Sequence, residues 1–62
     1  MGNVFEVKTI CYKREREWES RADAISFFKD CVVNSDGSEQ SRYITIVQQL
    51  MAGAVVSSDL VY

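Results

Sequence analysis

Cationic and aromatic residues that could bind nucleic acid are concentrated near the start of the chain. If residues 8–18 form one extended strand, the alternation of side chains places five of them on the same side. These are Lys8, Tyr12, Arg14, Arg16 and Trp18. Cations contact phosphates and aromatic rings stack on bases, which is what a surface for single-stranded nucleic acid requires. A turn within this segment would divide the surface. We favour the simpler interpretation, a solvated strand with alternating charges whose Trp18 packs over the start of a helix.

Apolar residues beside the expected core could instead bind a protein partner. Phe27 has two aspartates and an asparagine as its helical neighbours, and a large apolar side chain rimmed by carboxylates is a common anchor of protein contacts. Ile44 and Met51 lie one heptad apart, beside the apolar face of their helix. For these three residues we favour a role within the domain, with Phe27 covering a sheet edge, and keep partner binding as the alternative. The chain also ends in apolar residues, where most chains end in polar ones. The candidate partner-binding residues are Phe27, Ile44, Met51, Leu60, Val61 and Tyr62.

The residues that enzymes use most are missing or isolated. The chain has no histidine, which is the commonest general base and metal ligand. Its carboxylates form no catalytic motif, and its glycines are too isolated to form a phosphate-binding loop. Its two cysteines, Cys11 and Cys31, have no histidine with which to complete a zinc site. We therefore expect no metal or other cofactor and no enzymatic activity.

Charge and cysteine usage indicate the partners and the compartment. Seven Lys and Arg residues against nine Asp and Glu residues give a net charge of −2, whereas nucleic-acid binders are usually strongly basic. Small secreted scaffolds usually carry more cysteines than this chain, and no signal peptide is visible. We therefore expect a cytoplasmic protein. No apolar run approaches the roughly 18 residues of a membrane span, so no membrane partner is expected.

Strand-forming residues fill the first part of the chain. Residues 4–12 are rich in β-branched and aromatic types, and alternate residues from Phe5 to Cys11 share one side, which predicts a half-buried strand. Residues 13–18 predict a second short strand, reached by a tight reversal near Lys13–Glu15. Because no Asn-Gly or Asp-Gly marks that turn, one long bent strand is the alternative.

Two capped helices follow. Ser20 as the N-cap, with Asp23 completing a capping box, predicts a helix that runs to about Val33. After turn residues at 34–37, Ser38 is the expected cap of a second helix that stops at Gly53. The helical spacing predicts core residues at Ala24, Ile25, Phe28, Cys31, Val32, Tyr43, Ile46, Val47 and Leu50.

The order of these elements predicts an α+β fold. Residues 54–56 complete a β-β-α-α-β chain with a third short strand, which we expect to pair with the first. The simplest closure is a single two-layer domain over residues 1–62, with two antiparallel helices on one face of a small sheet. A chain of 62 residues buries only about 60% of its surface on folding. The free energy gained by burying its apolar part roughly cancels the conformational entropy lost in ordering the chain. We therefore expect a homo-oligomer, most simply a two-fold dimer.

Several short motifs resemble those of small uncharacterised bacterial proteins carried by phages and mobile elements. They are Val7-Lys8-Thr9-Ile10-Cys11-Tyr12, Trp18-Glu19-Ser20-Arg21-Ala22-Asp23-Ala24, Gly37-Ser38-Glu39 before Arg42-Tyr43, the step from Leu50 to Gly53, and Ser58-Asp59. The resemblance covers most of the chain and carries over no catalytic residue. It implies an accessory gene, and an action against host defences is one role that it leaves open.

Taken with the missing catalytic residues, these features predict a small accessory protein that acts by binding another protein. An inhibitor of a host or defence protein is the role that we expect. Nucleic-acid binding through residues 8–18 is the alternative from a different class.

Overall fold

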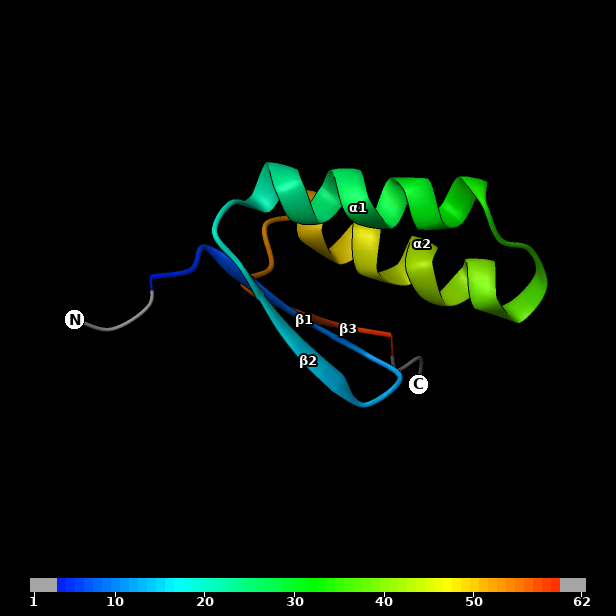
Figure 1. Ribbon diagram of the computed structural model, residues 1–62, viewed down its shortest axis with the longest axis horizontal. Coiled ribbons are helices and arrows are strands. Elements are labelled where there is room, and N and C mark those ends of the chain that lie inside the picture. Colours follow the sequence, from blue (N-terminus) through cyan, green and yellow to red (C-terminus); the bar gives the residue numbers. More distant parts are fainter. Residues whose placement is uncertain (1–3, 60–62) are drawn as a thin grey trace.

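Two helices cover one face of a three-stranded sheet in the computed structural model, which describes residues 4–59 (Figure 1). The elements are β1 (Val7–Cys11), β2 (Arg14–Trp18), α1 (Arg21–Val33), α2 (Gly37–Met51) and β3 (Val56–Ser58). The helices run antiparallel, side by side, in a layer of their own (Figure 1). This arrangement confirms the predicted α+β fold and its β-β-α-α-β order.

The first strand lies in the middle of the sheet, whose order is β2-β1-β3. β1 pairs antiparallel with β2 and parallel with β3, so the predicted pairing of the last strand with the first is confirmed. Val7 and Thr9 are buried under the helices. Lys8 and Ile10, which alternate with them, lie on the opposite face of the sheet, which the helices leave open.

The last strand begins two residues later than the predicted 54–56. Ala54 and Val55 complete the connection from α2, and the Ala54 carbonyl accepts a hydrogen bond from Arg21 across 2.7 Å. Because β3 is an edge strand with one open face, its apolar Val56 is exposed while the polar Ser57 is buried against the helices. Hydrophobicity is therefore a poor guide to which residues of this strand lie inside.

The hairpin turn consists of Tyr12 and Lys13, rather than the predicted Lys13–Glu15. Cys11 pairs with Arg14, so the loop has two residues, and both have positive φ, 54° at Tyr12 and 65° at Lys13. These angles are those of a type I′ turn, which matches the twist of the flanking strands but favours Asn-Gly. The Tyr12 N–H donates to a carboxylate oxygen of Asp59, 3.0 Å away. A residue 47 positions later therefore stabilises a turn that its own side chains disfavour.

Replacing Lys13 with glycine should make the protein more stable. A non-glycine residue in the left-handed region costs about 1 kcal/mol or more, and no Lys13 side-chain contact would be lost. We expect Lys13→Gly to raise the free energy of unfolding by about 1 kcal/mol, measured by urea denaturation. Arg14→Gly, one residue later in extended backbone, should lower it instead. An unchanged or lower stability of Lys13→Gly would contradict the left-handed geometry.

The helix boundaries follow the predicted caps at α1 and depart from them at α2. The Ser20 hydroxyl accepts a hydrogen bond from the Asp23 N–H at 3.1 Å, and α1 ends at Val33 as predicted. α2 begins at Gly37 with Asp36 as its N-cap, rather than after Ser38, and the Asp36 side chain makes no capping bond. Gly53 has a φ of 104°, which is the left-handed stop that was expected.

Arg21 ties the start of α1 to the end of α2. Its Nη1 donates to the carbonyls of Leu50 and Ala54, each at 2.7 Å, and its Nη2 lies 3.4 Å from the carbonyl of Gly53. The Leu50 carbonyl is one of the acceptors that a helix C-terminus leaves without intrahelical partners, and Gly53 and Ala54 directly follow the end of α2. The guanidinium also places a positive charge at the negative end of the α2 dipole. α2 thus receives its C-terminal cap from another helix.

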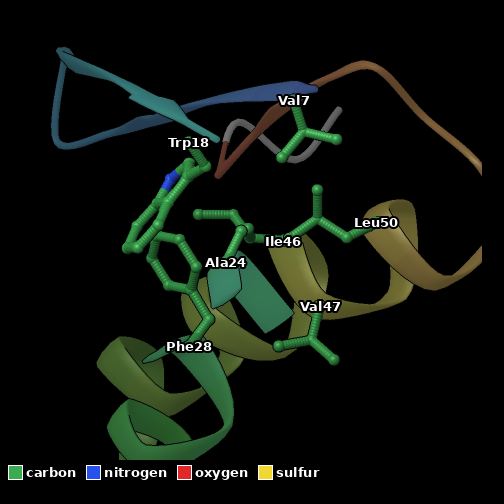
Figure 2. Packing of buried hydrophobic residues seen from close by; sticks show 7 residues of the cluster. All are labelled: Val7, Trp18, Ala24, Phe28, Ile46, Val47 and Leu50. Carbon is green, nitrogen blue, oxygen red and sulfur yellow. The ribbon is translucent and has the colours of Figure 1, made fainter. Parts of the chain in front are cut away.

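Seven apolar residues form the core between the sheet and the helices (Figure 2). They are Val7, Trp18, Ala24, Phe28, Ile46, Val47 and Leu50. All five core residues from the helices belong to the predicted apolar stripes. Cys11, Ile25 and Tyr43 are partly buried around this cluster. The side chain of Ile46 lies at the centre of the view in Figure 2, between those of Trp18 and Leu50.

Candidate partner-binding surfaces

The hairpin turn divides the residues that were candidates for nucleic-acid binding. Strand pairing places Arg16 opposite Thr9 and Arg14 opposite Cys11, on the face turned toward the helices. Lys8 pairs with Glu17 on the open face, and its ammonium forms an ion pair with Glu15. The one extended surface on which the five residues depended is therefore not formed.

Trp18 and Phe27 belong to an aromatic cluster with Phe28 and Tyr43. The Trp18 ring lies 5.2 Å from that of Phe27 and 6.0 Å from that of Phe28, and the Phe28 ring lies 6.1 Å from that of Tyr43. Trp18 is only 8% exposed. Its Nε1 donates to the buried hydroxyl of Thr9 at 3.0 Å. The indole is thus committed to the core and is not available to stack on a base.

Arg16 covers this cluster from the sheet side. Its guanidinium carbon lies 4.0 Å from the centre of the Trp18 ring and 5.0 Å from that of Phe27. A cation above an aromatic face is attracted by the ring quadrupole. Phe27 therefore lies at the flank of the domain, against the side chains of β2, as the favoured interpretation had it, and it remains partly exposed.

Tyr12, the fifth nucleic-acid candidate, is held by Arg42 and Asp59. The Arg42 guanidinium lies 4.8 Å from the centre of the Tyr12 ring and donates to Asp59 at 3.0 Å. Asp59 is only 3% exposed. Burial alone would raise the pKa of the Asp59 carboxyl, but the Tyr12 N–H and the Arg42 guanidinium outweigh it and hold that pKa below its ordinary value. This contact links the end of β3 to the hairpin and to α2.

The outer helix face, which we define as Val32, Val33, Ile44 and Met51, lies on the side of the helices away from the sheet, and the buried Val47 lies beneath it. A groove of about 270 Å³ between α1 and α2 is lined there by apolar atoms, with Lys29 and Gln48 at its sides. Val33 is 81% exposed and Ile44 is 36% exposed. Met51, one heptad after Ile44 on α2, is 63% exposed. Ile44 and Met51, two of the predicted partner-binding residues, therefore both lie on the exposed apolar surface of the outer helix face.

A second concave site, which we call the hollow, lies between the end of α1 and the start of α2. Its volume is about 360 Å³, and its lining includes the rings of Phe27 and Tyr43 and the acidic residues Asp30 and Glu39. Cys31 also lines it. The hollow is separate from the groove, because the two share no lining residue.

The two cysteines are free and partly buried. Burial is the main cause that raises the pKa of the Cys11 thiol to about 11, and the charge of Asp59 adds to it. Burial also raises the pKa of the Cys31 thiol, followed by the charges of Asp30 and Glu39. Both thiols are therefore protonated near neutral pH, which makes them poor nucleophiles.

Three predicted partner-binding residues cannot be placed, and three residues with structural roles were not predicted. Leu60, Val61 and Tyr62 lie outside the described residues 4–59. Arg42 and Asp59 were missed as a pair because they are far apart in the chain and follow no motif. The capping role of Arg21 was also missed, because a cap supplied from another helix leaves no local pattern.

The comparisons with known proteins add no further assignment. No family model, curated protein or solved structure matches the chain. Within residues 4–59, neither α1 nor α2 is long and apolar enough to cross a membrane.

Proposed function

We propose that this protein acts by binding other proteins rather than by catalysis, and that its outer helix face binds a second copy of the chain. The observation that carries the proposal is the apolar groove between α1 and α2, extended by the exposed side chains of Val33, Ile44 and Met51. Contiguous exposed apolar surface of this kind marks interaction sites in soluble proteins.

A second copy is the partner that this face fits best. A domain of this size gains little net stability from its own core. Burying the outer helix face against a second copy would therefore add a large fraction to the stability of the folded protein. Two copies related by a two-fold axis would each present the same strip to the other. Lys29 at the side of the groove can extend its ammonium to solvent while its methylenes cover apolar surface.

Replacing Ile44 with aspartate should weaken the dimer. A charged side chain at the centre of an apolar contact removes an anchor worth about 2 kcal/mol, which corresponds to a roughly 30-fold higher Kd. Light scattering after size exclusion measures the mass across a range of concentrations. We expect the wild-type mass to approach twice the 7.1 kDa of one chain. The Ile44→Asp variant should stay near the mass of one chain.

The matched control is Val56→Asp, which places the same charge on the open face of the sheet. Val56 is exposed like Ile44, but lies on β3, on the far side of the domain from the groove. This variant should keep the wild-type mass. A wild-type protein that remains at the mass of one chain at high micromolar concentration would contradict the dimer, and equal effects of both variants would place the contact elsewhere.

The accessory role carried by mobile elements, with inhibition of a host or defence protein, is part of the same proposal. It is supported by the resemblance of the short sequence motifs and by the absence of catalytic motifs in the sequence. Two thiols that form no disulfide fit a reducing compartment, which supports a place in the cytoplasm. Nucleic-acid binding is the less supported alternative, because Trp18 is buried and Lys8 faces away from Arg16. A titration with single-stranded DNA at two salt concentrations, compared with Arg16→Glu, separates the two classes.

A further inference from the structure

The hollow combines aromatic surface with negative charge. Phe27 and Tyr43 contribute ring surface from α1 and α2, while Asp30 and Glu39 contribute carboxylates from the same two helices. Phe27 is 42% exposed, so part of its ring is open to a ligand. A cation is the chemical group that gains from both kinds of surface, because it is attracted by ring faces and by carboxylates.

Within residues 4–59, the carboxylates of the hollow form no ion pair with a cationic side chain. The ion pairs formed within residues 4–59 are Lys8 with Glu15 and Arg42 with Asp59, and neither includes Asp30 or Glu39. The negative charge reaches the interior of the hollow. After burial, which is the first cause, Asp30 and Glu39 raise the pKa of the Cys31 thiol, and Glu39 raises the pKa of the Tyr43 hydroxyl. A positive charge placed here would relieve this potential.

We propose that the hollow binds the guanidinium group of an arginine presented by a partner protein. Arginine fits better than lysine because its guanidinium is planar, weakly hydrated and carries five donors, so that it can stack on a ring while it donates to carboxylates. The domain already uses this chemistry next to the hollow, where the Arg16 guanidinium lies over the rings of Trp18 and Phe27, which contact each other. A volume of about 360 Å³ accommodates one such side chain.

This site goes beyond the proposed dimer and is independent of it. The outer helix face and the hollow have no lining residue in common. The dimer and the hollow can therefore fail separately: the experiment below is carried out on the wild-type protein and repeated on Ile44→Asp, and the hollow should give the same result in both.

The test is a titration followed by the amide chemical shifts of the ¹⁵N-labelled protein. The probe is N-acetyl-arginine N-methylamide, and N-acetyl-norleucine N-methylamide is the neutral probe of similar length. We expect the arginine probe to shift the amides of residues 30–43 at millimolar concentrations, and the norleucine probe to leave them unchanged. The lysine counterpart should bind at least threefold more weakly.

The variant that removes the charge of the hollow is Asp30→Asn with Glu39→Gln. We expect it to weaken binding of the arginine probe by about tenfold, on the order of two partly exposed ion pairs. The matched control is Glu17→Gln with Glu19→Gln, which removes two negative charges elsewhere and should bind as the wild type does. Unchanged amide shift dispersion in both variants shows that they fold.

Three results would overturn the proposal. One is the absence of shifts with the arginine probe, and another is equal binding by the hollow variant and its control. The third is a set of hollow shifts that depends on protein concentration without any probe and disappears in Arg14→Gln. That outcome would show that a second copy, rather than another protein, supplies the arginine.

Discussion

Replacing Ile46 with alanine should remove most of the stability of this domain. Ile46 is fully buried, and its side chain lies between those of Trp18 and Leu50 (Figure 2). An Ile→Ala change at such a site costs about 2–5 kcal/mol, because transfer energy is lost and a cavity remains. A chain of this length has a total stability of roughly 3–9 kcal/mol. Thermal and urea denaturation followed by circular dichroism should therefore show a melting temperature and a urea midpoint far below those of the wild type.

A graded variant distinguishes core packing from a general loss of folding. Ile46→Val removes a single methylene and should cost about 1 kcal/mol, leaving a cooperative transition that can be measured. Because both variants alter the same buried side chain, their costs should rank with the volume removed. A loss of less than 1 kcal/mol for Ile46→Ala would contradict the position of Ile46 at the centre of the core.

Replacing Trp18 with alanine should have an effect of similar size for a different reason. The indole packs against Phe27 and Phe28, and its Nε1 donates to Thr9, whose side chain is 1% exposed. Its loss removes aromatic contacts and leaves the Thr9 hydroxyl without this partner, at a cost of about 3–5 kcal/mol. We expect Trp18→Ala to lower the melting temperature and the urea midpoint by about as much as Ile46→Ala does, in the same denaturation measurements.

Trp18→Phe separates the hydrogen bond from the packing. The phenylalanine ring keeps part of the contact with Phe27 and Phe28 but cannot donate to Thr9. We expect a loss of about 1–2 kcal/mol, which is typical of a buried polar group left without its partner. If Trp18→Phe lowered the free energy of unfolding as much as Trp18→Ala does, the aromatic contacts with Phe27 and Phe28 would contribute little to stability. That result would contradict the packing account.

The helices and the core could be predicted because their determinants are local. The Ser20 cap lies within three residues of the Asp23 N–H that it accepts, and the apolar spacing of α2 identifies Ile46, Val47 and Leu50 directly. The pairing of the last strand with the first was predictable from the small number of free sheet edges. Its position was not, because an edge strand with an open face can expose a valine and bury a serine.

The hairpin turn and the long-range contacts could not be read from neighbouring residues. Tyr12 and Lys13 lack turn preference, and their geometry depends on Asp59, which lies at the other end of the chain. Arg21 likewise binds carbonyls that are about 30 positions away. Each of these polar groups finds its partner only once the fold exists, so that no spacing along the sequence indicates it.

The placement of the candidate residues could be predicted only in part, for the same reason. Helical spacing placed Ile44 and Met51 beside the core face, and both are exposed along one strip. The five residues of the nucleic-acid candidate were grouped by strand alternation alone, and the turn at Tyr12 places Lys8 and Arg16 on opposite faces of the sheet. The hollow was not predicted, because it joins Phe27 and Asp30 of α1 to Glu39 and Tyr43 of α2.

The most direct test of the outer helix face is a measurement of contacts between two copies. A mixed sample of isotope-labelled and unlabelled protein at millimolar concentration permits nuclear Overhauser effects to be selected between chains. We predict effects between chains from the methyl groups of Val33, Ile44 and Met51, with none from Val56 on the opposite side of the domain. The absence of any effect between chains, or effects that arise only from Val56 and the open face of the sheet, would contradict the proposal that this protein associates through its helices.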